Sequence, residues 1–169
     1  MIKKCIVVDI DDTIVYEDYE GDLPTNNNRQ NWDDYHIERK YYEPSQYRII
    51  DEVVDIIKSY WIYKCCEPCL VFLTSREDTC NGMIRENTMQ LIHRIFGDIL
   101  SKQFYKTSYI LLMREENDFR PSAEVKADLL DKYILHEYKP ILSFDDDLNN
   151  SKMLLNKGFK ALQVHTKEL

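Results

Sequence analysis

Two short runs of aspartates stand directly behind apolar stretches of the sequence. Residues 9–13 read Asp-Ile-Asp-Asp-Thr after an apolar stretch that begins at Cys5, and residues 144–147 read Phe-Asp-Asp-Asp at the end of another. In an open α/β sheet the carboxyl ends of parallel strands share one edge, and ligands bind there. If the two stretches are neighbouring strands, up to six carboxylates converge on one crevice.

So many carboxylates in one place repel one another unless a cation compensates them. A hard divalent cation such as Mg²⁺ suits the place, because it prefers oxygen ligands and takes one or two carboxylates together with waters and phosphate oxygens. The alternative is that each run is a solvated turn whose aspartates cap helices. Two runs, each directly after an apolar stretch, favour the metal site.

Other side chains complement the acids. Thr74, Ser75 and Arg76 end a further apolar stretch with two hydroxyls and a guanidinium, a donor set that suits phosphate oxygens. Lys126 offers an ammonium for the same place, although a surface lysine paired with a nearby acid is its alternative interpretation. A carboxylate nucleophile, a second carboxyl group as acid and base, a divalent ion and cationic clamps together indicate phosphoryl transfer through an aspartyl-phosphate.

The elements that must position these residues alternate along the chain. Short continuous apolar runs alternate with segments of helical period, which predicts parallel β–α–β units whose strands are buried on both faces. The expected strands are 5–10, 70–73, 109–113, 141–144 and 161–164, and the expected helices lie around 49–61, 84–96, 125–134 and 151–156. The predicted fold class is therefore α/β with a mainly parallel sheet.

One segment breaks the alternation. Residues 16–46 are polar and rich in aromatic side chains, and a stretch of roughly 30 residues without a clear period is too long for an ordinary loop. We expect a flap or cap insertion here, within a single domain that spans residues 1–169. Its aromatic side chains have two interpretations that the sequence does not separate: they stack on the end base of a nucleic acid, or they shelter the sheet edge and close the pocket.

Composition limits the classes of protein. The 169 residues carry 22 basic and 30 acidic side chains, a formal net charge of −8. No apolar run approaches the roughly 20 residues of a membrane span, and the start does not resemble a signal peptide, so we expect a cytoplasmic protein without a membrane partner. The acidic balance argues against broad coating of nucleic acid, but not against a local basic pocket for one strand end. The sequence leaves the oligomeric state open.

The five cysteines, an odd number, predict free thiols in a reducing compartment. Three of them are clustered at Cys65, Cys66 and Cys69, and the last two have the spacing of a metal or redox pair. A structural zinc site needs four ligands, and no second pair follows at the expected distance. Buried or loop thiols that lead into a strand are therefore the favoured interpretation.

Taken in order, the motifs resemble those of a known family. Asp9-Ile10-Asp11-Asp12-Thr13, then Thr74, Lys126 and Asp145-Asp146 resemble the four signature motifs of the haloacid dehalogenase superfamily, over residues 5 to 164. The stretch from Leu112 to Lys126 resembles a block of the 3′-phosphatase domain of phage-type polynucleotide kinase-phosphatases. The resemblance implies a three-layer α/β/α Rossmann-like fold with a flap or cap insertion after the first strand.

The resemblance also implies catalytic roles. Asp9 would attack phosphorus, and Asp11 would protonate the leaving oxygen and later activate water. Thr74 and Lys126 would hold and neutralise the transferring phosphoryl group. Asp145 would orient Lys126 or a metal-bound water.

A magnesium site is implied as well. The Asp9 carboxylate, the main-chain carbonyl of Asp11 and the side chain of Asp146 would hold Mg²⁺. Because Asp147 follows, the motif pair is either Asp145 with Asp146 or Asp146 with Asp147. The apolar residue that ends the strand favours the first pair.

Four residues are expected to bind the substrate: Ser75, Arg76, Arg114 and Arg120. Arg76 matches an arginine that follows the second motif in the polynucleotide phosphatases. Arg114 and Arg120 match their basic block and would steer a nucleic-acid phosphate.

Together these features predict a Mg²⁺-dependent phosphomonoesterase whose favoured substrate is a 3′-phosphate end of nucleic acid. A nucleotidase or another small-molecule phosphatase of the same fold is the alternative, because it suits the acidic chain and needs no basic groove. A response-regulator receiver domain also combines clustered acids, a threonine and a lysine, but its phospho-accepting aspartate follows the third strand, where this sequence has Arg114-Glu115-Glu116. A binding module without catalysis is disfavoured, since every carboxylate that the mechanism needs is present.

Overall fold

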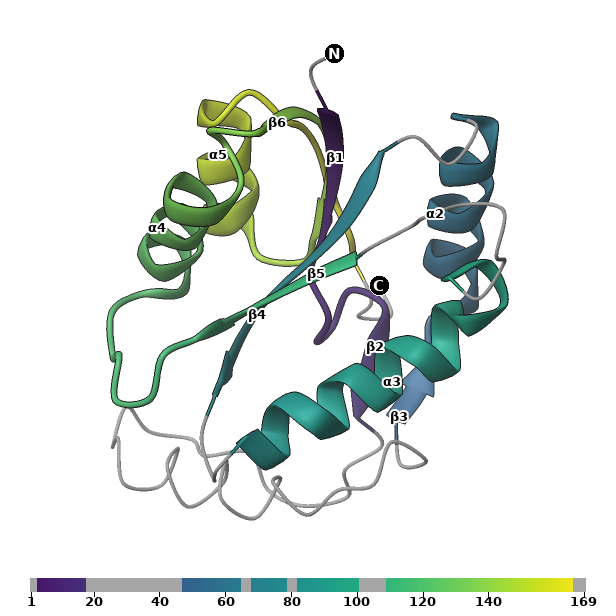
Figure 1. Ribbon diagram of the computed structural model, residues 1–169, viewed down its shortest axis with the longest axis horizontal. Helices are drawn as coiled ribbons and strands as arrows, with labels where there is room; N and C mark the ends of the chain where they lie inside the picture. Colours follow the sequence, from purple (N-terminus) through teal and green to yellow (C-terminus); the bar gives the residue numbers. More distant parts are fainter. Residues whose placement is uncertain (1–2, 18–46, 65–67, 79–81, 101–108, 166–169) are drawn as a thin grey trace.

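The computed structural model describes residues 3–17, 47–64, 68–78, 82–100 and 109–165. Within these ranges the chain forms a central five-stranded sheet, a two-stranded hairpin and the helices that flank them (Figure 1). The sheet contains β1 (Lys3–Val8), β4 (Cys69–Glu77), β5 (Tyr109–Arg114), β6 (Tyr138–Asp145) and β7 (Lys160–Gln163), and the hairpin contains β2 (Val15–Glu17) and β3 (Tyr47–Ile49). The helices are α2 (Asp51–Tyr63), α3 (Met83–Leu100), α4 (Ser122–Tyr133) and α5 (Leu148–Asn156).

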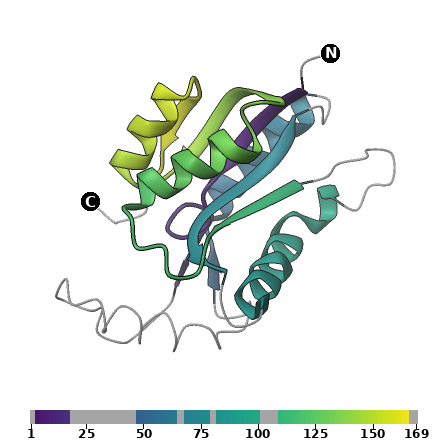
Figure 2. The same cartoon turned by 60° about the vertical axis from the view of Figure 1, so that its left-hand side comes forward.

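The strand order of the central sheet is β5-β4-β1-β6-β7, and all of its neighbouring pairs are parallel. β1 is the middle strand, so its carboxyl end lies between those of β4 and β6. Helices α4 and α5 cover one face of the sheet, and α2 and α3 cover the other (Figures 1 and 2). This arrangement confirms the predicted three-layer α/β/α Rossmann-like fold.

The buried parts of the inner strands β1 and β4 are apolar on both faces because each face of the sheet packs on helices. In β1, Ile6 and Val8 belong to the core under α2 and α3, whereas Cys5 and Val7 belong to the core under α4 and α5. Successive side chains of a strand point to opposite faces. Continuous apolar runs in the sequence, without alternation, are the consequence.

Several predicted boundaries differ from the observed ones, and two of these differences have identifiable reasons. β4 continues to Glu77, beyond the predicted end at residue 73, because its polar last residues still pair with β5 across an irregular register. Helix α5 begins at Leu148, earlier than the predicted residue 151. The carboxylate of Asp147 accepts hydrogen bonds from the backbone N–H groups of Asn149 and Asn150 and so caps the helix at this earlier point.

The hairpin follows the carboxyl end of β1. β2 and β3 are antiparallel, with Glu17 opposite Tyr47. The predicted insertion at 16–46 lies outside the described residues, except for its first two positions, which belong to β2. Among the described residues no helix has the length and apolar character that crossing a membrane requires.

Two cysteines occupy neighbouring strands. Cys5 and Cys69 are opposite each other in β1 and β4, and both are buried free thiols. Burial raises the pKa of Cys5 to about 12 and that of Cys69 to about 11, so both thiols stay protonated and unreactive at neutral pH. The other two members of the cysteine cluster, Cys65 and Cys66, lie outside the described residues.

Candidate active site

Polar side chains meet where β1, β4 and β6 end. Asp9 directly follows β1, Thr74 lies in the last part of β4, and Asp145 ends β6. All three are buried, and the backbone N–H of Asp9 donates to the carbonyl of Phe144 over 2.9 Å. This hydrogen bond continues the pairing of β1 with β6 past the strand end and keeps Asp9 beside Asp145.

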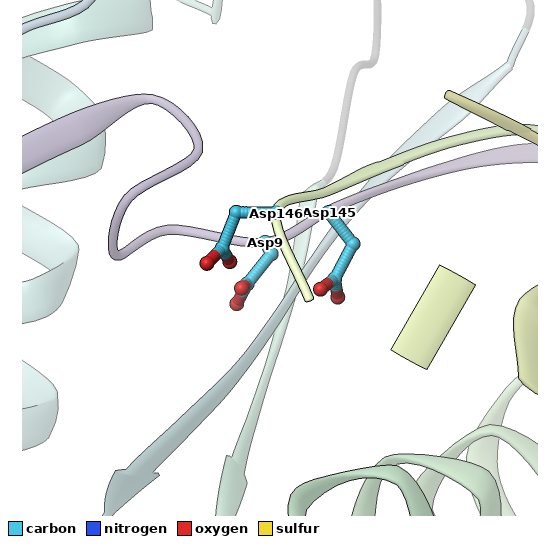
Figure 3. A group of neighbouring side chains, drawn as sticks. All are labelled: Asp9, Asp145 and Asp146. Atoms are coloured by element: carbon cyan, nitrogen blue, oxygen red, sulfur yellow. The ribbon is translucent and has the colours of Figure 1, made fainter. Parts of the chain in front are cut away.

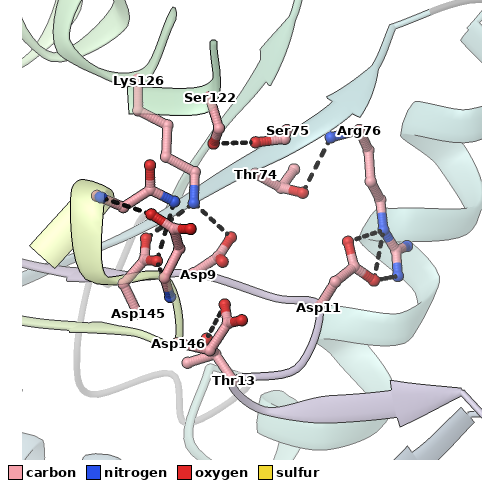
Figure 4. Close-up of polar contacts among 12 residues, drawn as sticks. Asp9, Asp11, Thr13, Thr74, Ser75, Arg76, Ser122, Lys126, Asp145 and Asp146 are labelled. Carbon is pink, nitrogen blue, oxygen red and sulfur yellow. Dashed lines mark hydrogen bonds and ion pairs between the residues drawn. The ribbon is translucent and has the colours of Figure 1, made fainter. Parts of the chain in front are cut away.

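Lys126 reaches the same place from the first turns of α4. Its neighbours in the helix, Val125 and Leu129, pack into the core under α4 and α5 and so set the side of the helix that faces the sheet. Only 1% of Lys126 is exposed, and its Nζ lies 2.9 Å from Oδ1 of Asp9 and 2.8 Å from Oδ2 of Asp145 (Figure 4). The alternative of a surface lysine is therefore wrong.

The charges of this group act strongly on one another. Burial alone would lower the pKa of Lys126, but the carboxylates of Asp9 and Asp145 outweigh it and raise that pKa, so the ammonium stays charged. Burial, together with repulsion from Asp145 and Asp11, raises the pKa of Asp9 well above its ordinary value despite the nearby ammonium. Burial and the neighbouring carboxylates of Asp145 and Asp12 likewise raise the pKa of Asp146.

Three carboxylates of the site form a potential metal-binding group. Oxygen atoms of Asp9, Asp145 and Asp146 all lie within 4.8 Å of one another (Figure 3). Among the residues that the structure describes, one ammonium, that of Lys126, pairs with these acids, so two negative charges are left over when all three are ionised. The donors are all oxygen atoms, which is the set that Mg²⁺ prefers.

Asp145 differs from the other two acids because its oxygens are already engaged. Oδ1 accepts hydrogen bonds from the side chain of Asn150 and from the backbone N–H of Asp147, each over 3.0 Å, and Oδ2 accepts from Lys126. Asp146 receives a longer contact of 3.5 Å from the hydroxyl of Thr13. The residues present therefore fit an ion held by Asp9 and Asp146, with Asp145 orienting Lys126.

The structure also separates Asp147 from this group, since its side chain caps α5. Asn150 is a site residue that the sequence analysis missed. It is buried on α5 and donates to Asp145, but an asparagine in a short helix carries no sequence signal for such a contact.

Asp11 faces a different partner from that of Asp9. Arg76 donates to both of its carboxylate oxygens, from Nη2 over 2.6 Å and from Nε over 2.9 Å (Figure 4). Nη1 of Arg76 donates to the hydroxyl of Thr88 over 3.2 Å, and the guanidinium lies 4.9 Å from the ring centre of Tyr47. The sequence analysis missed Thr88 and the contact of Tyr47 with Arg76, because residues of α3 and β3 carry no motif that relates them to Arg76.

Ser75 contacts the beginning of α4. Its hydroxyl and that of Ser122 are 2.5 Å apart, and the cap position of α4 is Pro121, whose side chain makes no capping hydrogen bond. The helix predicted around 125–134 therefore begins earlier, at Ser122, whose hydroxyl is directed to β4 and makes no capping hydrogen bond. A substrate contact by Ser75 stays a prediction.

Arg114 and Arg120 are engaged by the protein itself. Arg114 donates to the carbonyls of Ser75, Asp118 and Arg120, over 3.1, 2.7 and 2.7 Å, and burial lowers its pKa. Arg120 is more exposed and forms ion pairs with Asp118 and Asp128. Both arginines hold the loop between β5 and α4 in shape, and their predicted contact with substrate stays a prediction.

Comparisons with known proteins identify the family and the fold of the chain. Residues 3–168 match the family model described as the polynucleotide kinase PNKP phosphatase domain. Among solved structures, chains from the Pnkp1/Rnl/Hen1 RNA repair complex and from a second structure of the Pnkp1/Rnl/Hen1 complex superpose with TM-scores of 0.65 and 0.64, each with 21% identity over 96% of this chain. The chain spans 42% and 45% of those chains, and at this identity the likeness shows a shared fold. A search of curated proteins gives no match.

Proposed function

This chain belongs to the family of the polynucleotide kinase PNKP phosphatase domain, and we propose that it hydrolyses the phosphate monoester at the 3′ end of a nucleic-acid strand. The observation that carries the proposal is the buried contact of Lys126 with Asp9 and Asp145 at the edge where three parallel strands end. The name of the family and the RNA repair complex of the structural neighbours support a nucleic-acid end as the substrate.

In the first step an oxygen of Asp9 attacks phosphorus. Oδ1 accepts from Lys126, which orients Oδ2 as the attacking atom. A bond forms between this oxygen and phosphorus while the bond from phosphorus to the 3′ oxygen of the strand breaks. The product is an aspartyl-phosphate and a strand end that takes up a proton.

Lys126 and Thr74 stabilise the charge on the phosphoryl oxygens as this step proceeds. The hydroxyl oxygen of Thr74 accepts from the backbone N–H of Arg76 over 3.2 Å. The hydroxyl hydrogen of Thr74 is therefore directed elsewhere and serves as a donor to a phosphoryl oxygen. Both groups are buried, and water does not weaken their interaction with the transition state.

Asp11 carries the proton. It enters the first step protonated and gives this proton to the leaving 3′ oxygen. The carboxylate that remains accepts both hydrogen bonds from Arg76, and in the second step it removes a proton from the water that attacks phosphorus. That attack breaks the bond from phosphorus to the Asp9 oxygen, releases inorganic phosphate and restores the carboxylate of Asp9.

Mg²⁺ is the cofactor that the donor set fits. The Asp9 carboxylate, the Asp146 carboxylate and the main-chain carbonyl of Asp11 would hold it, and when bound it supplies positive charge against the acids of the site and the phosphate oxygens. Asp145 has its oxygens engaged by Asn150, Asp147 and Lys126 and so stays a partner of the lysine.

The experiment that tests the proposal compares substrates. Phosphate release by the purified chain is measured on a 3′-phosphorylated oligonucleotide and on 3′- and 5′-mononucleotides at equal concentration, each with Mg²⁺ and with EDTA. We expect the oligonucleotide to be the best substrate and EDTA to abolish turnover. Faster turnover of mononucleotides would make the chain a nucleotidase, which its net charge of −8 would suit, and full rates in EDTA would remove the magnesium site.

A further inference from the structure

We propose that Arg76, held in place by Thr88 and Tyr47, is a positioning residue for Asp11 and does not grip the phosphate of the substrate. The inference rests on the proposed function, in which Asp11 transfers the proton. It replaces the substrate-binding role that the sequence predicts for Arg76.

The Nε–Nη2 edge of the guanidinium, which could donate two hydrogen bonds to a phosphate, faces Asp11. Nη2 donates to Oδ1 over 2.6 Å and Nε donates to Oδ2 over 2.9 Å. A planar guanidinium that donates two parallel hydrogen bonds fixes both the direction and the plane of a carboxylate. Asp11 is only half-buried and lies in the loop after β1, so this contact restricts a side chain that the loop alone would leave with several rotamers.

Thr88 holds the other end of the guanidinium. Its hydroxyl donates to the carbonyl of Ile84, one turn earlier in α3, over 2.7 Å. The single hydroxyl hydrogen is therefore used within the helix, and the oxygen faces Nη1 of Arg76 as an acceptor at 3.2 Å. Thr88 is fully buried, so its position is fixed by the packing of α3 on the sheet.

Tyr47 supports the flat face of the same group. The guanidinium carbon of Arg76 lies 4.9 Å from the centre of the Tyr47 ring, within the range of a cation–π contact. Tyr47 is itself partly buried against the core under α2 and α3. Arg76 is thus fixed in three directions, by Asp11, by Thr88 and by Tyr47.

These contacts relate three elements to one catalytic side chain. Arg76 belongs to β4, Thr88 to α3 and Tyr47 to β3, and their common point is the carboxylate of Asp11. Small displacements of a catalytic group lower the rate strongly, by as much as about 100-fold for 1 Å. A residue that removes such displacements raises kcat without binding the substrate.

The test uses a pair of variants at position 88. Thr88→Val keeps the shape of the side chain and removes the acceptor, whereas Thr88→Ser keeps the hydroxyl and removes a methyl group. We expect Thr88→Val to lower kcat by roughly tenfold or more, with KM and the inhibition constant of orthovanadate within about twofold of the wild type. Thr88→Ser is expected to restore most of the kcat that Thr88→Val loses.

Two kinetic outcomes would overturn the inference. A rise in KM and in the inhibition constant of orthovanadate in Thr88→Val, at unchanged kcat, would make Arg76 a phosphate clamp. A loss in Thr88→Ser as large as that in Thr88→Val would reduce Thr88 to a packing residue. If Thr88→Val does not fold, Tyr47→Leu and Tyr47→Phe form the equivalent pair, since only phenylalanine keeps the ring under Arg76.

A measurement without turnover separates this inference from the proposed function. The Nε–H of Arg76, assigned by nuclear magnetic resonance, is expected to exchange slowly in the wild type and in Thr88→Ser and fast in Thr88→Val. Equal exchange in all three proteins would overturn the positioning role. A wild type that shows this pattern but releases no phosphate from any substrate would overturn the proposed function alone.

Discussion

Two groups of charged side chains in this protein each combine aspartates with basic residues and differ in how these are paired. The Lys126 cluster (Asp9, Lys126, Asp145 and Asp146) is largely buried and has three acids for one base. The Arg120 loop (Arg114, Asp118, Arg120 and Asp128) is more exposed and has two acids for two bases. The presence of acids beside bases therefore does not distinguish the candidate active site from a surface cluster. Unbalanced charge in a buried place distinguishes the two.

The Arg120 loop has its donors matched to acceptors of the protein. Arg114 donates to backbone carbonyls, and Arg120 pairs with two aspartates. Exposed ion pairs of this kind contribute little to stability because water competes for both partners. In the Lys126 cluster, by contrast, excess negative charge is kept away from water at a cost in folding free energy.

The strongest test of this difference removes the nucleophile. Asp9→Asn keeps the shape of the side chain but removes the attacking oxygen, so we expect kcat to fall by at least about 10³-fold. Phosphate release from a 3′-phosphorylated oligonucleotide measures it, and circular dichroism confirms that the variant is folded. Turnover near that of the wild type would contradict the covalent mechanism.

Removal of the ammonium has the next largest effect. In Lys126→Met the carboxylates of Asp9 and Asp145 lose their buried counter-charge, and a broken buried pair typically lowers the free energy of unfolding by about 3–5 kcal/mol. Activity is expected to fall by roughly 10²-fold or more, since the variant also loses the charge that stabilises the phosphoryl group. Urea unfolding and phosphate release measure the two losses, and an active variant of unchanged stability would show that the contacts are incidental.

The pH dependence of stability has a sign that follows from Asp9. Burial raises its pKa above the ordinary value of 3.8, so between these two values the folded chain binds more protons than the unfolded one. In EDTA, the melting temperature is therefore expected to rise as the pH falls from neutral into this range. Asp9→Asn should show a smaller rise and a higher melting temperature at neutral pH.

Scanning calorimetry of both proteins at several pH values checks this. Identical slopes in wild type and variant would mean that Asp9 is not the group that titrates. Asp146, whose pKa is also raised, contributes in the same direction and remains in both proteins.

The smallest effect is expected in the Arg120 loop. Arg120→Ala removes an exposed side chain that pairs with the partly buried Asp118 and the exposed Asp128, so we expect kcat and melting temperature close to those of the wild type and a KM within about threefold. Steady-state kinetics on the oligonucleotide at two salt concentrations measures it. A large rise in KM for the oligonucleotide, with none for a mononucleotide, would restore the predicted steering role of Arg120.

The fold could be predicted from the sequence because burial on both faces makes the inner strands β1 and β4 continuous apolar runs. The ends of the strands were harder to predict. Ser75, Arg76 and Glu77, for example, extend β4 with polar residues, which carry no apolar signal. For α5 the signal was present: Asp147 is an N-cap residue, but it stands in a run of acids that was interpreted as metal-binding.

The site was predictable as a set of residues and less so as a set of contacts. Sequence order indicated that Asp9, Lys126 and Asp145 belong together, and the structure brings them within hydrogen-bond distance. That Arg76 donates to Asp11 depends on side-chain rotamers and on the placement of α3, which no local pattern encodes. The same reason explains why Thr88 was missed.

The hairpin of β2 and β3 has a consequence for how the chain tolerates changes in length. Glu17 and Tyr47 are opposite each other in adjacent strands, so the two ends of the segment between them are fixed at neighbouring points. The entropy of closing a loop grows only slowly with loop length. An insertion or deletion between residues 17 and 47 is therefore expected to change the free energy of unfolding little, as long as β2 and β3 stay paired.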